Sequence, residues 1–147
     1  LASQVAHPPV HVIRRKRGAD VLRPLSPEHP DDEIVDGLLI VRPEGRLFFA
    51  NAERVADLLW ARFDAARPRV LLLDCRALFD VEYTALKVLD ETEQKLRQAG
   101  CELWLAGMNP AVFAVVDRSR FGARLGRGRM FLNMQAAVEA FQQEVKS

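Results

Sequence analysis

The fold is decided by one stretch of the chain, VLLLDCRALFDVEYTALKVLDETEQKL, residues 70–96. Its first part, Val70 to Leu73, is wholly apolar and ends at Asp74, which predicts a strand buried on both faces. From Thr84 to Ala99 the apolar residues recur with a helical period, and Gly100 then stands where glycine commonly ends a helix. The expected inward side chains of this helix are Ala85, Leu86, Leu89 and Leu96. The stretch therefore predicts a strand followed by a helix, the repeating unit of an α/β sheet.

The same alternation of strand and helix continues on both sides of this unit. Short apolar runs predict strands at 38–41, 47–49, 102–106 and 130–132. Helices are expected over 52–66, from Pro110 onward and after residue 133, with N-caps at Asn51, Asn109 and Asn133. The turn residues Pro43, Glu44 and Gly45 predict that the strands at 38–41 and 47–49 form a hairpin. These elements predict a mixed sheet whose later strands are parallel.

The composition indicates one globular domain. The chain has 147 residues, of which 49% are hydrophobic, and its 21 basic and 20 acidic residues leave a formal charge of +1. This balance offers no general reason to expect a nucleic-acid partner. No apolar run approaches the roughly 20 residues that a membrane-spanning helix needs. If the strands at 70–74 and 102–106 are parallel neighbours, Cys75 and Cys101 lie about 16 Å apart. We therefore expect two free thiols and a reducing compartment.

The first part of the chain differs from the rest. Residues 1–33 contain five of the eight prolines, namely Pro8, Pro9, Pro24, Pro27 and Pro30. Proline at this density disfavours helices and interrupts sheet ladders. We expect residues 1–33 to be a basic, proline-rich linker with one short strand near Val10, Val12 and Ile13, and residues 34–147 to be the folded domain.

A basic cluster follows that expected strand, formed by Arg14, Arg15, Lys16 and Arg17. The simplest interpretation is a solvated basic turn. A second is a cluster at the cytoplasmic surface of a membrane, next to a membrane segment that precedes Leu1. A nucleic-acid arm is disfavoured because no aromatic residues are interleaved with the cations.

Catalytic and cofactor motifs are missing from the sequence. There is no phosphate-binding G-x-x-x-x-G-K loop, no G-x-G-x-x-G after a strand and no G-x-S-x-G elbow. The three histidines lie within the first 29 residues, and with two cysteines they lack metal-site spacing. Asp74, Asp80 and Glu82 could form an acid–base pair, but loops at strand ends are often acidic. We expect no catalytic residues, no metal and no cofactor.

The turn before the central helix is the strongest candidate for a binding site. It brings Asp74 to the carboxyl end of a central strand, where α/β sheets usually place their sites, and Glu82, Tyr83 and Thr84 to a helix N-terminus. A phosphate on Tyr83 or Thr84 would be stabilised by the helix end. The structural interpretation, which we prefer on physical grounds, makes Thr84 the N-cap and Tyr83 a partly buried anchor. Nucleotide binding near the 74–84 turn is a further alternative.

Three segments resemble a known family. LFFANA (47–52), the stretch 70–96 and ELWLAGMNPAV (102–112) resemble the STAS domain, and more narrowly the cytoplasmic C-terminal STAS domain of SulP-type anion permeases. The resemblance covers about residues 10–145. It implies an α/β fold with a mixed β-sheet and helices packed mainly on one face.

The resemblance also implies a function. It suggests a non-catalytic regulatory domain of a transporter for sulfate, bicarbonate or a dicarboxylate, on the cytoplasmic side of an inner (plasma) membrane. The implied partner is the transporter's own transmembrane domain, which is absent from this chain. A homodimer formed through the full-length transporter and a cytosolic protein are further candidates, whereas nucleic acid is not expected.

A free-standing anti-sigma-factor antagonist is the alternative within the same resemblance. In that branch an aspartate precedes a phosphorylatable serine at the helix start. By position Glu82 corresponds to the aspartate and Tyr83 to the serine, so a serine-kinase switch at Tyr83 is not expected. Thr84 could take a phosphate only by giving up its expected capping role. This alternative also predicts a natural Met start, where the sequence has Leu1.

Overall fold

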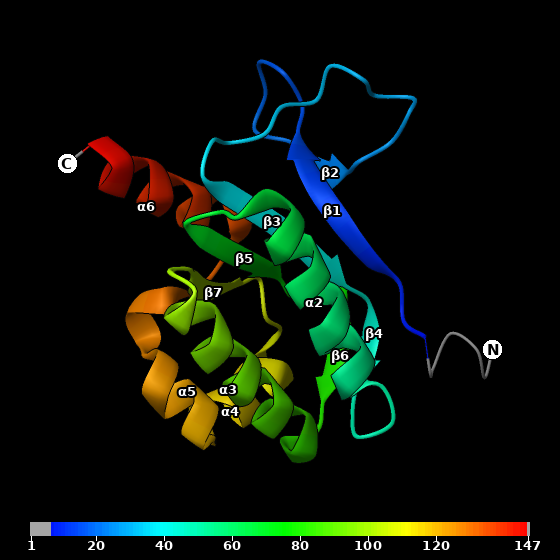
Figure 1. Ribbon diagram of the computed structural model, residues 1–147, viewed down its shortest axis with the longest axis vertical. Coiled ribbons are helices and arrows are strands. Elements are labelled where there is room, and N and C mark those ends of the chain that lie inside the picture. Colours follow the sequence, from blue (N-terminus) through cyan, green and yellow to red (C-terminus); the bar gives the residue numbers. More distant parts are fainter. Residues whose placement is uncertain (1–6, 147) are drawn as a thin grey trace.

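A six-stranded mixed sheet forms the centre of the protein, whose computed structural model describes residues 7–146 (Figure 1). The strand order is β2-β1-β3-β5-β7-β8. Strand β1 runs antiparallel to β2 and β3, whereas β3, β5, β7 and β8 are parallel neighbours. The predicted mixed sheet with parallel later strands is confirmed. The strands of this sheet are β1 (Val10–Arg15), β2 (Leu22–Pro24), β3 (Leu38–Pro43), β5 (Val70–Asp74), β7 (Glu102–Ala106) and β8 (Met130–Phe131).

Helices cover both faces of the sheet unequally. One face packs against α2 (Ala52–Ala66), α3 (Tyr83–Gln98), α4 (Pro110–Arg118) and α5 (Arg120–Leu125), whereas α6 (Met134–Lys146) covers the other. Strand β5 is buried throughout because Leu71 and Leu73 point into the larger core and Leu72 into the core beneath α6. Its apolar run is therefore explained by cores on both faces. The expectation of helices mainly on one face is confirmed.

The predicted hairpin between the strands at 38–41 and 47–49 is wrong. Strand β4 (Gly45–Leu47) does not pair with β3 but lies parallel to β6 (Leu78–Val81), and the two form a separate small sheet. Gly45, at a φ of +91°, redirects the chain away from β3. Residue 48 lies outside the strand, and residues 49–51 form the turn that leads into α2. Strand β6 was not anticipated because LFDV buries only its first and last residues and lacks the period-2 pattern of a half-buried strand.

The three asparagine caps have different outcomes. Asn109 and Asn133 accept hydrogen bonds from Val112 N and Ala136 N, both at 2.8 Å, and are confirmed as caps. Asn51 occupies the N-cap position of α2, but its side chain makes no cap bond. Its Oδ1 accepts from Phe48 N at 3.0 Å, and its Nδ2 donates to Arg46 O at 2.7 Å. Asn51 therefore holds the turn between β4 and α2. Helix α5, which carries its own Ser119 cap, was not predicted.

The N-terminal region contributes to the sheet. Strand β1 pairs with β3 from Val10 to Ile13, and Ile13 is buried in the core beneath α6. The expected short strand is confirmed, and it extends further than expected. Arg14 and Arg15 belong to β1, and only Lys16 and Arg17 lie in the turn before Gly18. Half of the basic cluster is therefore held by strand pairing.

The two cysteines are free and buried, as predicted. Strands β5 and β7 are parallel neighbours, which confirms the arrangement that separates them. Burial raises the pKa of the Cys75 thiol to about 12 and that of Cys101 to about 11. Because the thiolate is the reactive species, both side chains are chemically quiet in the folded protein.

We predict that native protein at pH 8 reacts with a thiol reagent such as DTNB at least about a hundredfold more slowly than protein unfolded in urea. The reason is that burial both blocks access to Cys75 and Cys101 and disfavours their thiolates. The variant Ala99→Cys, which adds an exposed thiol, serves as the positive control. Rapid labelling of either native cysteine would contradict the buried placement.

Candidate functional site

Asp74 ends β5 as a fully buried carboxylate between two arginines. Its Oδ2 accepts from Arg42 Nε of β3 at 2.8 Å. Arg76 donates to the same carboxylate from its backbone N at 3.1 Å, from Nε at 2.9 Å and from Nη2 at 2.8 Å. Burial by itself would raise the pKa of Asp74, but the hydrogen bonds from Arg76 and Arg42 outweigh it and hold the pKa below its ordinary value. Asp74 is thus an ionised structural anchor.

Glu82, and not Thr84, occupies the N-cap position of α3. Its backbone is extended, at φ −88° and ψ 149°, and Tyr83 is the first helical residue. The expectation that Thr84 is the N-cap is wrong, because Glu82 N is already held in the extended form by a 2.8 Å bond to Leu47 O of β4. Thr84 donates its hydroxyl back to Glu82 Oε1 at 2.6 Å.

Arg46 ties the start of α3 to the small sheet. Its Nε donates to Asp80 at 3.0 Å and its Nη2 to Glu82 at 3.2 Å. The guanidinium also lies 4.6 Å from the centre of the Phe48 ring. Glu82 is therefore held by Arg46 and Thr84 together. Asp80 and Glu82 are therefore both paired with Arg46 and do not form a free acid–base pair.

Tyr83 lies at the surface. It is 57% exposed, and its hydroxyl donates to the carbonyl of Arg118 at the end of α4, at 3.3 Å. It therefore joins α3 to α4 but is less buried than the anchor that we expected. Two further aromatic side chains, Phe49 at 73% and Phe79 at 66%, are also exposed. They stand on the β4–α2 turn and on β6, and we call Phe49, Phe79 and Tyr83 the aromatic tip.

The four predicted residues of the turn do not form one cluster. Glu82 and Thr84 are in contact, and Tyr83 stands between them in the chain. Among residues 7–146, no hydrogen bond or ion pair joins Asp74 to any of these three. Asp74 instead bonds Arg42 and Arg76, because β6 intervenes in the chain between Asp74 and α3. The predicted turn therefore divides into a buried anchor and an exposed helix start.

Sequence reasoning missed the aromatic tip and the arginines that organise this region. Phe49 was assigned to a strand and Phe79 to an undefined turn, so neither was considered as a surface residue. The available signal for an exposed aromatic surface was the presence of Phe49 and Phe79 in short segments near Gly45 and Asp80. Arg46 offered no signal, because its two carboxylate partners lie more than 30 residues away.

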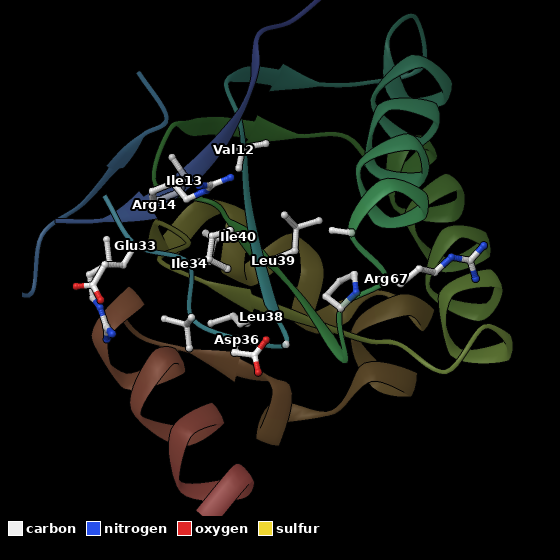
Figure 2. A pocket seen from close by; sticks show the side chains of 15 residues that line it. Val12, Ile13, Arg14, Glu33, Ile34, Asp36, Leu38, Leu39, Ile40 and Arg67 are labelled. Carbon is white, nitrogen blue, oxygen red and sulfur yellow. The ribbon is translucent and has the colours of Figure 1, made fainter. Parts of the chain in front are cut away.

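The basic cluster borders an open groove. The groove has a volume of about 420 Å³ and lies between β1, residues 33–37, the start of β3 and the C-terminal end of α2. Figure 2 shows Arg14 beside Val12 on β1, whereas Arg67 extends away from them. Within the part of the chain that the structure describes, Arg14, Arg15, Lys16 and Arg17 form no ion pair. Lys16 and Arg17 are exposed to an external partner, whereas Arg14 and Arg15 are half-buried.

Two further properties bear on the kind of site. Within the described residues, no group of three or more metal-ligating side chains could hold a metal ion. Between residues 7 and 146, no helix is long and apolar enough to cross a membrane.

The fold and these contacts define a mixed α/β domain with exposed helix and loop surfaces and with ion-paired carboxylates at the carboxyl edge of its sheet. The family model of the STAS domain matches residues 29–137. The chain therefore belongs to the STAS family, as its three motif segments suggested.

Relatives with this domain are sulfate transporters. Sulfate transporter 1.2 of Arabidopsis thaliana is 24% identical over 147 residues, which cover 93% of this chain and 22% of the relative. A protein of Mycobacterium tuberculosis named as a probable sulfate transporter is 26% identical over 143 residues, 96% of this chain and 25% of that protein. The chain thus spans about a quarter or less of these relatives.

Solved structures share the fold. The murine Slc26a9 anion transporter in its inward-facing state superimposes with a TM-score of 0.82 at 18% identity, over 92% of this chain and 22% of the transporter. The STAS domain of a SulP transporter from Vibrio cholerae gives a TM-score of 0.65 at 20% identity, over 81% and 91%. The unphosphorylated anti-sigma factor antagonist SpoIIAA gives 0.60 at 14% identity, over 76% and 94%.

We predict that Asp74→Asn lowers the free energy of unfolding by about 3 kcal/mol, because it leaves two arginines around a neutral group. Urea denaturation at pH 7 measures the loss. The control Asp64→Asn removes an exposed ion pair to Arg67 and should change stability by less than about 0.5 kcal/mol.

The pH dependence gives a second test of the same carboxylate. The pKa of Asp74 is lower in the folded state than its ordinary value of 3.8. The ionised carboxylate therefore stabilises the fold at pH values above 3.8, and this stabilisation is lost as the pH falls below that value. The stability difference between wild type and Asp74→Asn should therefore shrink on acidification. A difference independent of pH would show that the variant acts through packing instead.

Proposed function

We propose that this chain is the non-catalytic regulatory domain of a SulP-type secondary transporter for an inorganic or small organic anion, of the sulfate, bicarbonate or dicarboxylate class. The observation that carries the proposal is that nearly the whole chain aligns with a fraction of each sulfate transporter it resembles. A STAS domain that accounts for about a quarter of a transporter leaves the rest of that protein to supply the transport path. The partner of this domain would be its own transmembrane part, on the cytoplasmic side.

The electrostatics of the sheet edge support a role without chemistry. A general acid or base needs a carboxylate that can exchange its proton near neutral pH. Asp74 is buried with a lowered pKa, and Asp80 and Glu82 both pair with Arg46. Asp80 and Glu82 hold the start of α3 through Arg46, and Asp74 anchors the end of β5. What remains accessible is the aromatic tip, which suits contact with another protein surface.

The basic cluster supports an orientation toward the membrane. Four adjacent cations without a carboxylate partner in the described chain would face the anionic headgroups of the cytoplasmic leaflet. Each could contribute about 1 kcal/mol when it lies near that surface. Arg14 and Arg15 are held in β1, where neighbouring side chains point to opposite faces, and Lys16 and Arg17 lie in the turn that follows it.

A phospho-switch module is the second candidate, favoured by the shared fold of the unphosphorylated antagonist SpoIIAA. The local contacts favour it less. Thr84 is bonded to the carboxylate of Glu82, so a phosphate there would meet a neighbouring negative charge. Mass spectrometry of the protein isolated from its own cells decides between the regulatory domain and the phospho-switch module. A stoichiometric phosphate on Tyr83 or Thr84 would favour the switch.

The regulatory role predicts a transport defect from the aromatic tip. In the full-length gene product, Phe49→Ser with Phe79→Ser should lower the rate of uptake of the transported anion at least about fivefold, the effect of a coupling free energy near 1 kcal/mol. Radiolabelled sulfate is the first anion to assay, followed by bicarbonate and a dicarboxylate. The matched control is Arg54→Ser with Arg62→Ser on the exposed face of α2. Equal uptake by both variants, at equal expression, would contradict the proposal.

The membrane orientation predicts salt-sensitive vesicle binding. The domain should sediment with vesicles that contain phosphatidylserine, and replacing Arg14, Arg15, Lys16 and Arg17 by Ala should abolish this binding. Raising the ionic strength should weaken it in the wild type, because exposed charges are screened. Four exposed arginines on other elements, Arg54, Arg62, Arg118 and Arg120, changed to Ala, form the charge-matched control. Unchanged binding by the cluster variant would refute the orientation.

A further inference from the structure

The edge strand β8 presents an apolar side chain to solvent. It pairs with β7, and among residues 7–146 no strand lies on its outer side. Leu132 follows β8 directly and is 88% exposed, the largest exposed fraction among the large hydrophobic side chains of the described residues. Because β8 has only two residues, this edge offers a partner side chains rather than a ladder of backbone groups.

An apolar groove lies between this edge and the start of α4. It has a volume of about 540 Å³ and is lined by one cation, Arg127, and by Met108, Pro110, Phe113, Met130, Phe131 and Leu132. The Arg127 guanidinium lies 5.6 Å from the centre of the Phe113 ring. One surface therefore carries both an apolar groove and a strongly exposed apolar side chain.

The ion pairs beside the groove are complete within the chain. Arg127 donates from Nε and Nη2 to the two carboxylate oxygens of Asp117, at 3.1 and 2.8 Å. Arg129, the next cation along the chain, lies 3.0 Å from the carboxylate of Glu102. Each cation has one anion, so these groups have no net charge. An occupant of the groove must therefore offer apolar contact and charges of both signs.

We propose that the occupant is a second copy of this chain, related by a two-fold axis. Leu132 of each copy would pack into the groove of the other, against Phe113. A two-fold contact uses the same patch on both sides, so the patch must contain the groove and the group that fills it. Its charges must also match themselves. The pair of Arg127 and Asp117 meets this condition, because the two-fold axis can set Arg127 of one copy against Asp117 of the other.

The contact is expected to be weak between free chains. One groove and one projecting side chain in each copy make a small interface, and small interfaces are typically transient. Two copies anchored in one membrane would meet at a raised effective concentration, which favours such a contact. This one step rests on the proposed function, whereas the contact itself is a property of the free chain.

Sedimentation velocity tests the contact. Between about 10 and 500 µM, the wild type should show reversible self-association in the range of weak interfaces. Leu132→Asp should lower the association constant at least about tenfold, because it brings a charge into an apolar groove. The matched control Ile34→Asp makes the same change at a side chain that is 61% exposed on the segment before β3, and it should leave association unchanged. A monomeric wild type, or equal association by both variants, would overturn the proposal.

A charge swap tests the two-fold arrangement. Asp117→Arg and Arg127→Asp each place like charges across the axis, so each should lower the association constant at least about tenfold. An equal mixture of the two variants restores opposite charges at both crossings and should associate to within about threefold of the wild type. The ion pair within each chain stays broken in the mixture, so recovery can come only from contact between copies. A mixture that associates no better than either variant would overturn the arrangement.

Other occupants of the groove have their own signatures. Vesicle binding that Leu132→Asp abolishes would overturn the proposal in favour of a membrane surface. Self-association that the Ala variant of residues 14–17 removes, and Leu132→Asp does not, would overturn it in favour of a contact through the basic cluster. Because sedimentation of the free chain uses neither vesicles nor a transported anion, its failure is seen separately from failure of the proposed function.

Discussion

One buried, ionised carboxylate, that of Asp74, constrains the carboxyl edge of the sheet. The exposed surface of this domain depends on that edge. Asp74 can remain charged without water only because Arg42 and Arg76 supply several donors to it. Arg42 comes from the neighbouring strand β3, so the pair locks β3 to the end of β5. Arg76 comes from the following loop and is packed against Gly107, where a Cβ would lie 2.7 Å from Arg76 Cγ. The end of β7 therefore also depends on the position of this arginine.

The path of the chain after Asp74 follows from that constraint. With Arg76 folded back over the carboxylate, the chain continues into β6 and pairs with β4. That pairing brings Arg46 to Asp80 and Glu82, and the backbone bond from Glu82 to Leu47 sets where α3 begins. Phe79 of the aromatic tip is exposed because Leu78 and Val81 are the residues of β6 that enter the core. Ion pairs to Arg46 thus fix the two carboxylates beside the start of α3.

The basic cluster and the aromatic tip lie on different parts of the domain. The cluster is on β1 and the turn after it, whereas the tip is on the β4–α2 turn, on β6 and at the start of α3. In the proposed function the cluster on β1 faces anionic headgroups. The cluster is joined to the rest of the domain through β3, because β3, β5 and β7 are linked by continuous hydrogen bonding.

The sequence by itself determined the features that depend on residues close together in the chain. The strands at 70–74 and 102–106, the helix predicted from about Thr84 and the caps Asn109 and Asn133 were predictable. Apolar periodicity and cap chemistry depend on residues only a few positions apart. The motif segments likewise indicated the STAS family. Tertiary structure alone decided the partner of β4, the N-cap at Glu82 and the separation of Asp74 from the exposed helix start. Each of these depends on contacts between residues some 30 positions apart, whose free energies no local pattern reveals.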